Sequence, residues 1–82
     1  MSGRRTSKPT VAYRPVTYRR EALAAVLCIS TDVLDRWDSS GKVPQPAVLS
    51  GMKFWNAAEI QHWVDAGMPD RASWAEMKAA QQ

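Results

Sequence analysis

Closely spaced breaker and capping residues divide this chain into short elements, and their order limits the folds that it can adopt. Cys28-Ile29-Ser30 separates two stretches with helical apolar spacing, and Ser30 is a good N-cap for a second helix through Asp38. Gly41 is suited to end that helix in a left-handed conformation. Pro44-Gln45-Pro46 then forces an extended connection. This order predicts helices packed on a small sheet rather than one long helix.

The elements on either side of this helix pair are predicted from the same signals. Thr17 is expected to cap the first helix, which ends near Cys28. Residues 47–49 and 53–55 have the pattern of two short strands around a glycine-containing turn. Residues 11–13 could form a further short strand. A two-stranded hairpin is marginal alone, so we expect it to pack on the helices.

The C-terminal half of the chain predicts two more helices. Asn56, with Glu59 three residues later, resembles a capping box and opens a helix that ends before Gly67. Good helix formers then continue to about Ala80. The expected fold class is mainly α with a small β-hairpin. We divide the chain into a basic N-terminal arm, a central domain and a C-terminal helix, at residues 1–16, 17–67 and 68–82.

Length and composition predict one small domain with a single modest core, in which each large side chain matters. Cys28 is expected to be a buried small apolar residue, and a lone cysteine indicates a reducing compartment. No apolar run approaches the roughly 20 residues of a membrane span, and the N-terminus lacks the apolar segment of a secretory signal. We therefore expect a cytoplasmic protein without membrane contact. Four tryptophans are expected to supply much of the core: Trp37, Trp55, Trp63 and Trp74.

Basic charge is concentrated at the N-terminus. The whole chain carries 11 basic and 8 acidic residues, a net charge of +3. No acidic residue occurs in residues 1–20, so the excess of positive charge lies entirely there. A basic arm favours a polyanion partner, because each neutralised phosphate releases a counterion. The alternative is a solvated tail that aids solubility. The basic residues concerned are Arg4, Arg5, Lys8, Arg14, Arg19 and Arg20.

The helix ending in Arg36-Trp37 is followed by Ser40-Gly41-Lys42-Val43-Pro44 and then by a hairpin ending in Phe54-Trp55. This order resembles the small winged-helix domains of the excisionase and MerR-like group. The resemblance leaves out the basic arm and the last helix, and much of it consists of core and turn residues. Further matching residues are Ser30, Leu34, Leu49, Gly51, Glu59, Ile60 and Trp63.

The resemblance implies a winged helix-turn-helix, with an extra C-terminal helix, that binds double-stranded DNA. With the small size and the basic arm, the chain is similar to phage-type excisionases, the recombination directionality factors of temperate actinobacterial phages. Such proteins act in the bacterial host cell, where they bind arrayed sites in attachment DNA, bend it and direct an integrase toward excision. A small phage or prophage transcriptional regulator is the alternative, because many regulators share this fold.

On this interpretation the second helix enters the major groove and the hairpin tip lies along the neighbouring minor groove. Arg36 could instead pair with Asp32 or Asp35 on its own helix. The candidate DNA-binding residues are Arg19, Arg20, Thr31, Asp32, Asp35, Arg36, Lys42, Ser50, Met52 and Lys53, with Arg4, Arg5, Lys8 and Arg14 of the arm along the backbone.

The chain departs from the family pattern in the turn and on the second helix. Cys28 stands where the turn usually has glycine, so a left-handed residue there would cost about 1 kcal/mol. Asp32 and Asp35 stand where basic or uncharged polar residues are common, and acids repel phosphate. We therefore expect weak direct reading of bases.

Other function classes have less support. The sequence has no acid–base pair at telling spacing, no glycine-rich phosphate loop and no metal-ligand cluster, so we expect no enzyme and no cofactor. Trp74 and Met77 lie on one stripe of the last helix, which either packs on its own domain or contacts a neighbour. That neighbour could be another copy on DNA, since one module buries only about 600–1,000 Å². A protein-interaction adaptor using this stripe is the rival from another class.

Overall fold

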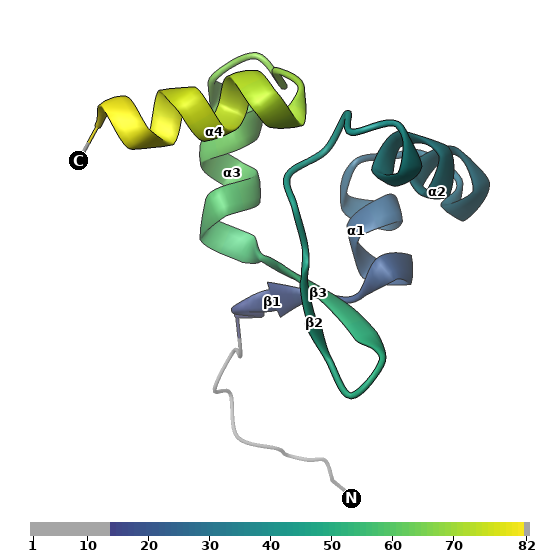
Figure 1. Ribbon diagram of the computed structural model, residues 1–82. Helices are drawn as coiled ribbons and strands as arrows, with labels where there is room; N and C mark the ends of the chain where they lie inside the picture. The colour runs from purple at the N-terminus through teal and green to yellow at the C-terminus, as the bar shows by residue number, and fades with distance from the viewer. Residues whose placement is uncertain (1–13, 82) are drawn as a thin grey trace, which may run out of the picture.

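A three-stranded antiparallel sheet and four short helices make up the part of the chain that the structure describes, residues 14–81 of a computed structural model (Figure 1). The strands follow the order β1-β3-β2 in the sheet. The elements in chain order are β1 (Thr17–Tyr18), α1 (Arg20–Val26), α2 (Thr31–Ser39), β2 (Ala47–Leu49), β3 (Met52–Asn56), α3 (Ala57–Asp65) and α4 (Arg71–Ala80).

The sequence prediction of a two-stranded sheet was incomplete, and the prediction that Thr17 caps the first helix was wrong. Thr17 lies in β1 opposite Asn56, and Tyr18 lies opposite Trp55. The helix begins at Arg20 after Arg19, whose side chain makes no capping hydrogen bond. A β-branched residue beside the open edge of β3 favours strand pairing over capping. The strand suggested for residues 11–13 lies outside the described residues.

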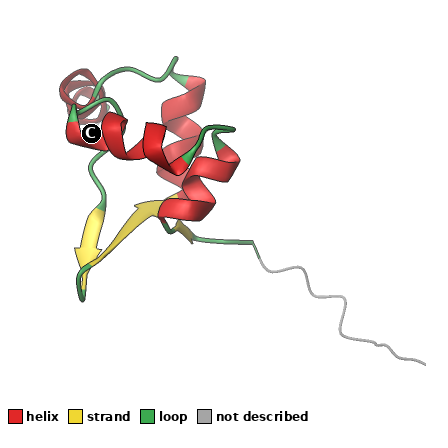
Figure 2. Ribbon diagram, turned by 90° about the vertical axis from the view of Figure 1, so that its right-hand side faces the viewer, coloured by secondary structure: helices red, strands yellow, loops and turns green. Residues whose placement is uncertain are grey.

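The β2–β3 hairpin projects below the helices and turns at Ser50-Gly51 (Figure 2). Ala47 pairs with Phe54 and Leu49 with Met52. Both turn residues have positive φ angles, 53° at Ser50 and 76° at Gly51, which is the conformation that a two-residue hairpin turn requires. The hairpin predicted from the sequence is therefore confirmed, with β3 longer at both ends than expected.

Side-chain caps fix the starts of three helices. The Ser30 hydroxyl accepts a hydrogen bond from the Val33 amide at 3.1 Å, and the Asn56 carboxamide accepts one from the Glu59 amide at 2.8 Å. Asp70 caps α4 in the same way, through the amide of Ser73. The capping predictions at Ser30 and Asn56 are confirmed. Each cap satisfies a backbone donor that the helix itself leaves without a partner.

The prediction that Cys28, in the turn between α1 and α2, is buried was wrong. Its φ is 61°, so the turn accepts a left-handed non-glycine residue, and its side chain is exposed rather than buried. Ile29 packs against the core in its place. The backbone amides of Cys28 and Ile29 bond to the carbonyls of Ala25 and Ala24, which closes the turn after α1.

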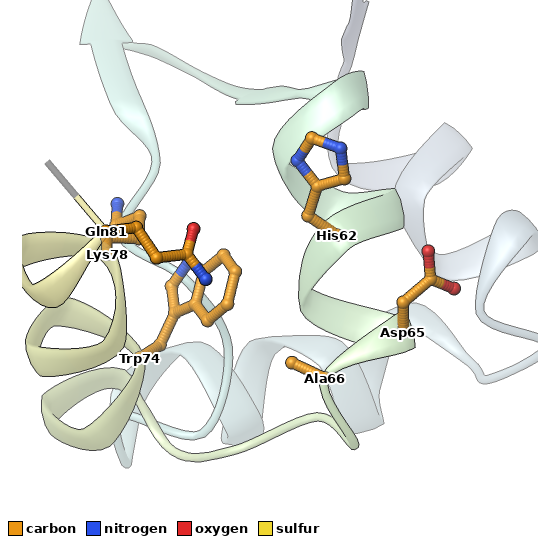
Figure 3. Close-up of a pocket in the computed structure, with 6 residues that line it drawn as sticks. All are labelled: His62, Asp65, Ala66, Trp74, Lys78 and Gln81. Atoms are coloured by element: carbon orange, nitrogen blue, oxygen red, sulfur yellow. The ribbon is translucent and has the colours of Figure 1, made fainter.

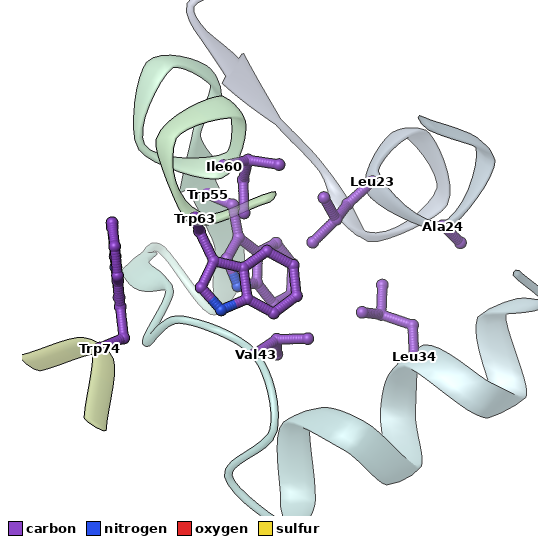
Figure 4. Close-up of a cluster of buried hydrophobic side chains, with 8 residues drawn as sticks. All are labelled: Leu23, Ala24, Leu34, Val43, Trp55, Ile60, Trp63 and Trp74. Carbon is purple, nitrogen blue, oxygen red and sulfur yellow. The ribbon is translucent and has the colours of Figure 1, made fainter. Parts of the chain in front are cut away.

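The core lies where α1, α2, α3 and β3 meet, and Trp74 of α4 closes one side (Figure 4). Trp63, Leu23 and Leu34 are among its largest fully buried side chains. Trp37, the fourth tryptophan, is only half-buried at its edge. No helix within residues 14–81 is both long enough and apolar enough to cross a membrane. The buried set is Leu23, Ala24, Leu34, Val43, Trp55, Ile60, Trp63 and Trp74.

The three buried indoles are also anchored by hydrogen bonds. Trp55 Nε1 donates to the Pro44 carbonyl at 2.8 Å, and Trp63 Nε1 donates to the Pro69 carbonyl at 2.7 Å. Trp74 Nε1 donates to Glu59 Oε2 at 2.9 Å. A buried indole N–H without an acceptor would be costly, so these bonds fix each ring in one orientation.

Candidate nucleic-acid interface

The outer face of α2 carries three exposed polar side chains among the predicted contacts. Asp32, Asp35 and Arg36 are exposed, whereas Leu34 on the opposite face is fully buried. Thr31, the first residue of the helix, is half-buried. Within residues 14–81 Arg36 takes part in no ion pair, so the alternative in which it pairs with Asp32 or Asp35 is not what the structure contains.

Asp35 is bound instead by Arg20, from the first turn of α1. The guanidinium contacts both carboxylate oxygens, Nε to Oδ1 at 2.7 Å and Nη2 to Oδ2 at 2.8 Å. This hydrogen bonding from Arg20 lowers the pKa of Asp35 and raises the pKa of Arg20. A bidentate pair at the surface joins α1 to α2 and fixes their relative orientation. It also means that Arg20 must leave Asp35 before it can give its full charge to a phosphate.

Asp38, near the end of α2, joins the hairpin and the last helix to that helix. Its carboxylate binds Lys53 of β3 through Oδ2 and Arg71 of α4 through Oδ1, the second at 2.8 Å. Only 11% of the Asp38 side chain is exposed. Arg71 also donates to the carbonyl of Val43 at 3.0 Å and to the carbonyl of Asp38 at 3.3 Å. Its amide bonds to the Gly41 carbonyl at 2.9 Å.

Sequence reasoning missed both Asp38 and Arg71 as residues that organise this surface. The two lie 33 positions apart, and no periodicity relates them. The only signal was the position of Arg71 directly after the Asp70 cap, which places its backbone at the start of a helix. The capping prediction for Glu59 was likewise incomplete, because its carboxylate binds Trp74 and Lys78 rather than completing a capping box.

Arg19 lies against β3 of the hairpin, whose tip carries three further predicted contacts. The Arg19 guanidinium stands 5.5 Å from the centre of the Phe54 ring in β3, a cation–π arrangement that leaves the side chain exposed. Ser50, Met52 and Lys53 are exposed, as predicted for a tip that could reach a partner. Of these three side chains, Lys53 forms an ion pair within the fold, because its ammonium group binds the Asp38 carboxylate.

The remaining predicted contacts are dispersed. Lys42 is exposed in the loop after α2, and its charge helps to lower the pKa of Asp70 beyond the larger effect of the hydrogen bonds from Ser73. Arg14 is exposed at the start of the described chain. Arg4, Arg5 and Lys8 lie outside the described residues.

Trp74 and Met77, the predicted contacts of α4 with a neighbour, differ in burial. Trp74 is 6% exposed and packs in the core, as expected if this part of the stripe packs on its own domain. Met77 remains 37% exposed. Between α3 and α4 the structure leaves a hollow of about 590 Å³ beside Trp74, with His62 and Lys78 at its margins (Figure 3).

Within residues 14–81 no three His, Cys, Asp or Glu side chains gather in a group that could hold a metal ion. Comparison of the chain with models of known families, with curated protein sequences and with solved structures found no match.

Proposed function

We propose that the protein binds double-stranded DNA through a winged helix-turn-helix formed by α1, α2 and the β2–β3 hairpin, and that it acts as an excisionase. The observation that carries this proposal is the ion pair between Asp38 and Lys53. It ties the hairpin to α2 while the outer face of α2 and the hairpin tip both stay exposed. In this arrangement α2 serves the major groove and the hairpin the adjacent minor groove.

Among the residues of α2, Arg36 is the leading candidate for a base or phosphate contact. It is exposed and is held by no acidic side chain of residues 14–81, unlike Arg20 and Lys53. Asp35 is occupied by Arg20, so it has little capacity to accept from a cytosine amino group. Asp32 alone keeps that capacity and would act as a filter against other bases.

Specific binding by this small module requires neighbouring copies on DNA. One module of this size buries about 600–1,000 Å², too little for tight and selective binding alone. An excisionase meets this requirement by filling an array of sites, bending the DNA and contacting an integrase. A transcriptional regulator with the same domain is the alternative, and an adaptor that binds protein rather than DNA is the more distant one.

Footprinting on attachment and promoter DNA tests the role. Evenly spaced protected sites with enhanced cleavage between them support the excisionase, and a single protected operator in a promoter supports the regulator. If about five phosphates are neutralised, the logarithm of the affinity should fall against the logarithm of salt concentration with a slope near −4.5. A flat response would favour the adaptor.

A matched pair of variants tests the assignment of α2. Arg36→Gln removes one positive charge from the outer face of α2 and should weaken binding by about 5- to 150-fold if Arg36 reads a base. Lys78→Gln removes the same charge from α4, where Lys78 pairs with Glu59. Equal effects of the two substitutions would contradict the assignment of α2 to the DNA.

A further inference from the structure

A groove between α1 and α3 exposes apolar side chains that the fold itself does not cover. Val26 is 51% exposed, Met68 is 41% exposed and Val64 is 38% exposed. They line a hollow of about 280 Å³ together with Tyr18 and Ala57, among others. Apolar side chains gathered in this way on a small protein commonly mark a contact surface. None of the residues that line the groove belongs to α2.

The described chain starts at one end of this groove. The carbonyl of Val16 accepts a hydrogen bond from the Ala57 amide at 3.0 Å, and Ala57 lines the groove at the start of α3. Tyr18, two residues further on, lines it as well. The 13 residues before Arg14 therefore connect to the body directly beside the groove.

The nearest part of that segment has the chemistry to fill the groove. Residues 11–13 are Val-Ala-Tyr, and apart from Met1 they are the only apolar residues in residues 1–13. Pro15 restricts Arg14 to extended conformations, which carries the chain onward rather than back on itself. An extended chain from Val16 to Tyr13 spans about 10 Å, at ~3.3 Å per residue. The helix from Ala57 to Val64 also spans about 10 Å, at ~1.5 Å per residue.

We propose that residues 11–13 of the same chain dock in this groove, with the Tyr13 ring against Val26 and Val64. The covalent connection gives the segment an effective concentration on the order of millimolar, which a separate partner rarely reaches. Docking covers the exposed apolar side chains and fixes the point from which the basic residues 4–8 leave the body. This proposal does not depend on DNA binding.

Nuclear magnetic resonance of the full chain tests the docking. We expect nuclear Overhauser effects between the Tyr13 ring and the methyl groups of Val26 and Val64, unchanged on dilution. Tyr13→Ser should abolish them and shift the same methyl resonances, while the matched substitution Thr10→Ser should leave both as they are. The dispersion of the amide resonances reports separately whether the variant is folded.

Three results would overturn the proposal. The ring and the methyl groups could show no Overhauser effect, or Tyr13→Ser could leave the methyl resonances unmoved in a folded protein. The effects could also appear between differently labelled molecules in a mixed sample, which would assign the groove to a second copy.

Discussion

Replacing Asp38 with alanine removes the carboxylate that joins α2 to both the hairpin and α4. Arg71 would lose its 2.8 Å bond to Oδ1 but keep its bonds to the carbonyls of Val43 and Asp38. Lys53 would lose its only carboxylate partner within residues 14–81. The substitution therefore tests whether these contacts of Asp38 contribute measurably to the free energy of unfolding.

The expected cost follows from exposure. The Asp38 and Arg71 side chains are 11% and 29% exposed, so their charge-assisted hydrogen bond is only partly screened and should contribute about 1.5–3 kcal/mol. Lys53 is 50% exposed, and its pair should add less than about 1 kcal/mol. We expect Asp38→Ala to lower the free energy of unfolding by about 2 kcal/mol and the melting midpoint by about 8–16 °C.

Urea and thermal unfolding, followed by far-ultraviolet circular dichroism, measure both quantities. Asp32→Ala is the matched control, because it removes the same charge from an exposed position of the same helix. Its loss should be about 0.3–1 kcal/mol, from the favourable position of an acid in the first helical turn. A loss for Asp38→Ala no larger than that of the control would refute the reasoning. A cycle with Arg71→Ala should give a coupling of more than about 1 kcal/mol.

Substitutions at three further positions test the helices and the surface pair. Leu34→Ala should cost about 2–5 kcal/mol in urea unfolding, because a fully buried side chain leaves a cavity, and a smaller loss would mean that α2 repacks. Ser30→Ala should cost about 1 kcal/mol through the lost bond to the Val33 amide, whereas Ser30→Gly should cost only a few tenths of that amount. Asp35→Asn should reduce the acid sensitivity of the fold. The hydrogen bonds from Arg20 hold the pKa of Asp35 below its ordinary value, so the ion pair stabilises the protein above about pH 4. This stabilisation is lost as the pH falls through the pKa that Asp35 has in the folded protein. Melting midpoints measured from about pH 6 down to about pH 2, a range that brackets the ordinary Asp pKa of about 4, should therefore fall less steeply in the variant. Parallel curves for the variant and the unaltered protein would contradict this.

Local signals predicted most of the secondary structure because they act over three or four residues. Ser30 and Asn56 cap the helices that follow them, and Gly51 forms the hairpin turn as expected. β1 was missed because a two-residue strand has no periodicity of its own and exists through pairing with β3. The exposure of Cys28 was missed because it depends on which residue of the turn, Cys28 or Ile29, faces the core.

The candidate interface was less predictable than the fold, because its electrostatics depend on contacts between distant segments. The exposed positions of Arg36 and Met52 follow from helical and strand periodicity. The neutralisation of Arg20 by Asp35 and of Lys53 by Asp38 does not, since each pair spans 15 positions and two elements. Charge counted along the sequence therefore overstated the positive charge that this surface presents.

Because the other three indoles are anchored in the core, the fluorescence of Trp37 can be distinguished from theirs. Trp55, Trp63 and Trp74 are buried and hydrogen-bonded, so their emission reports the integrity of the fold. Trp37 is half-buried and lines a surface hollow with Arg36. A ligand that covers this end of α2 without unfolding the protein should alter the fluorescence of Trp37 alone. In a Trp37→Phe protein the same ligand should cause no change in fluorescence.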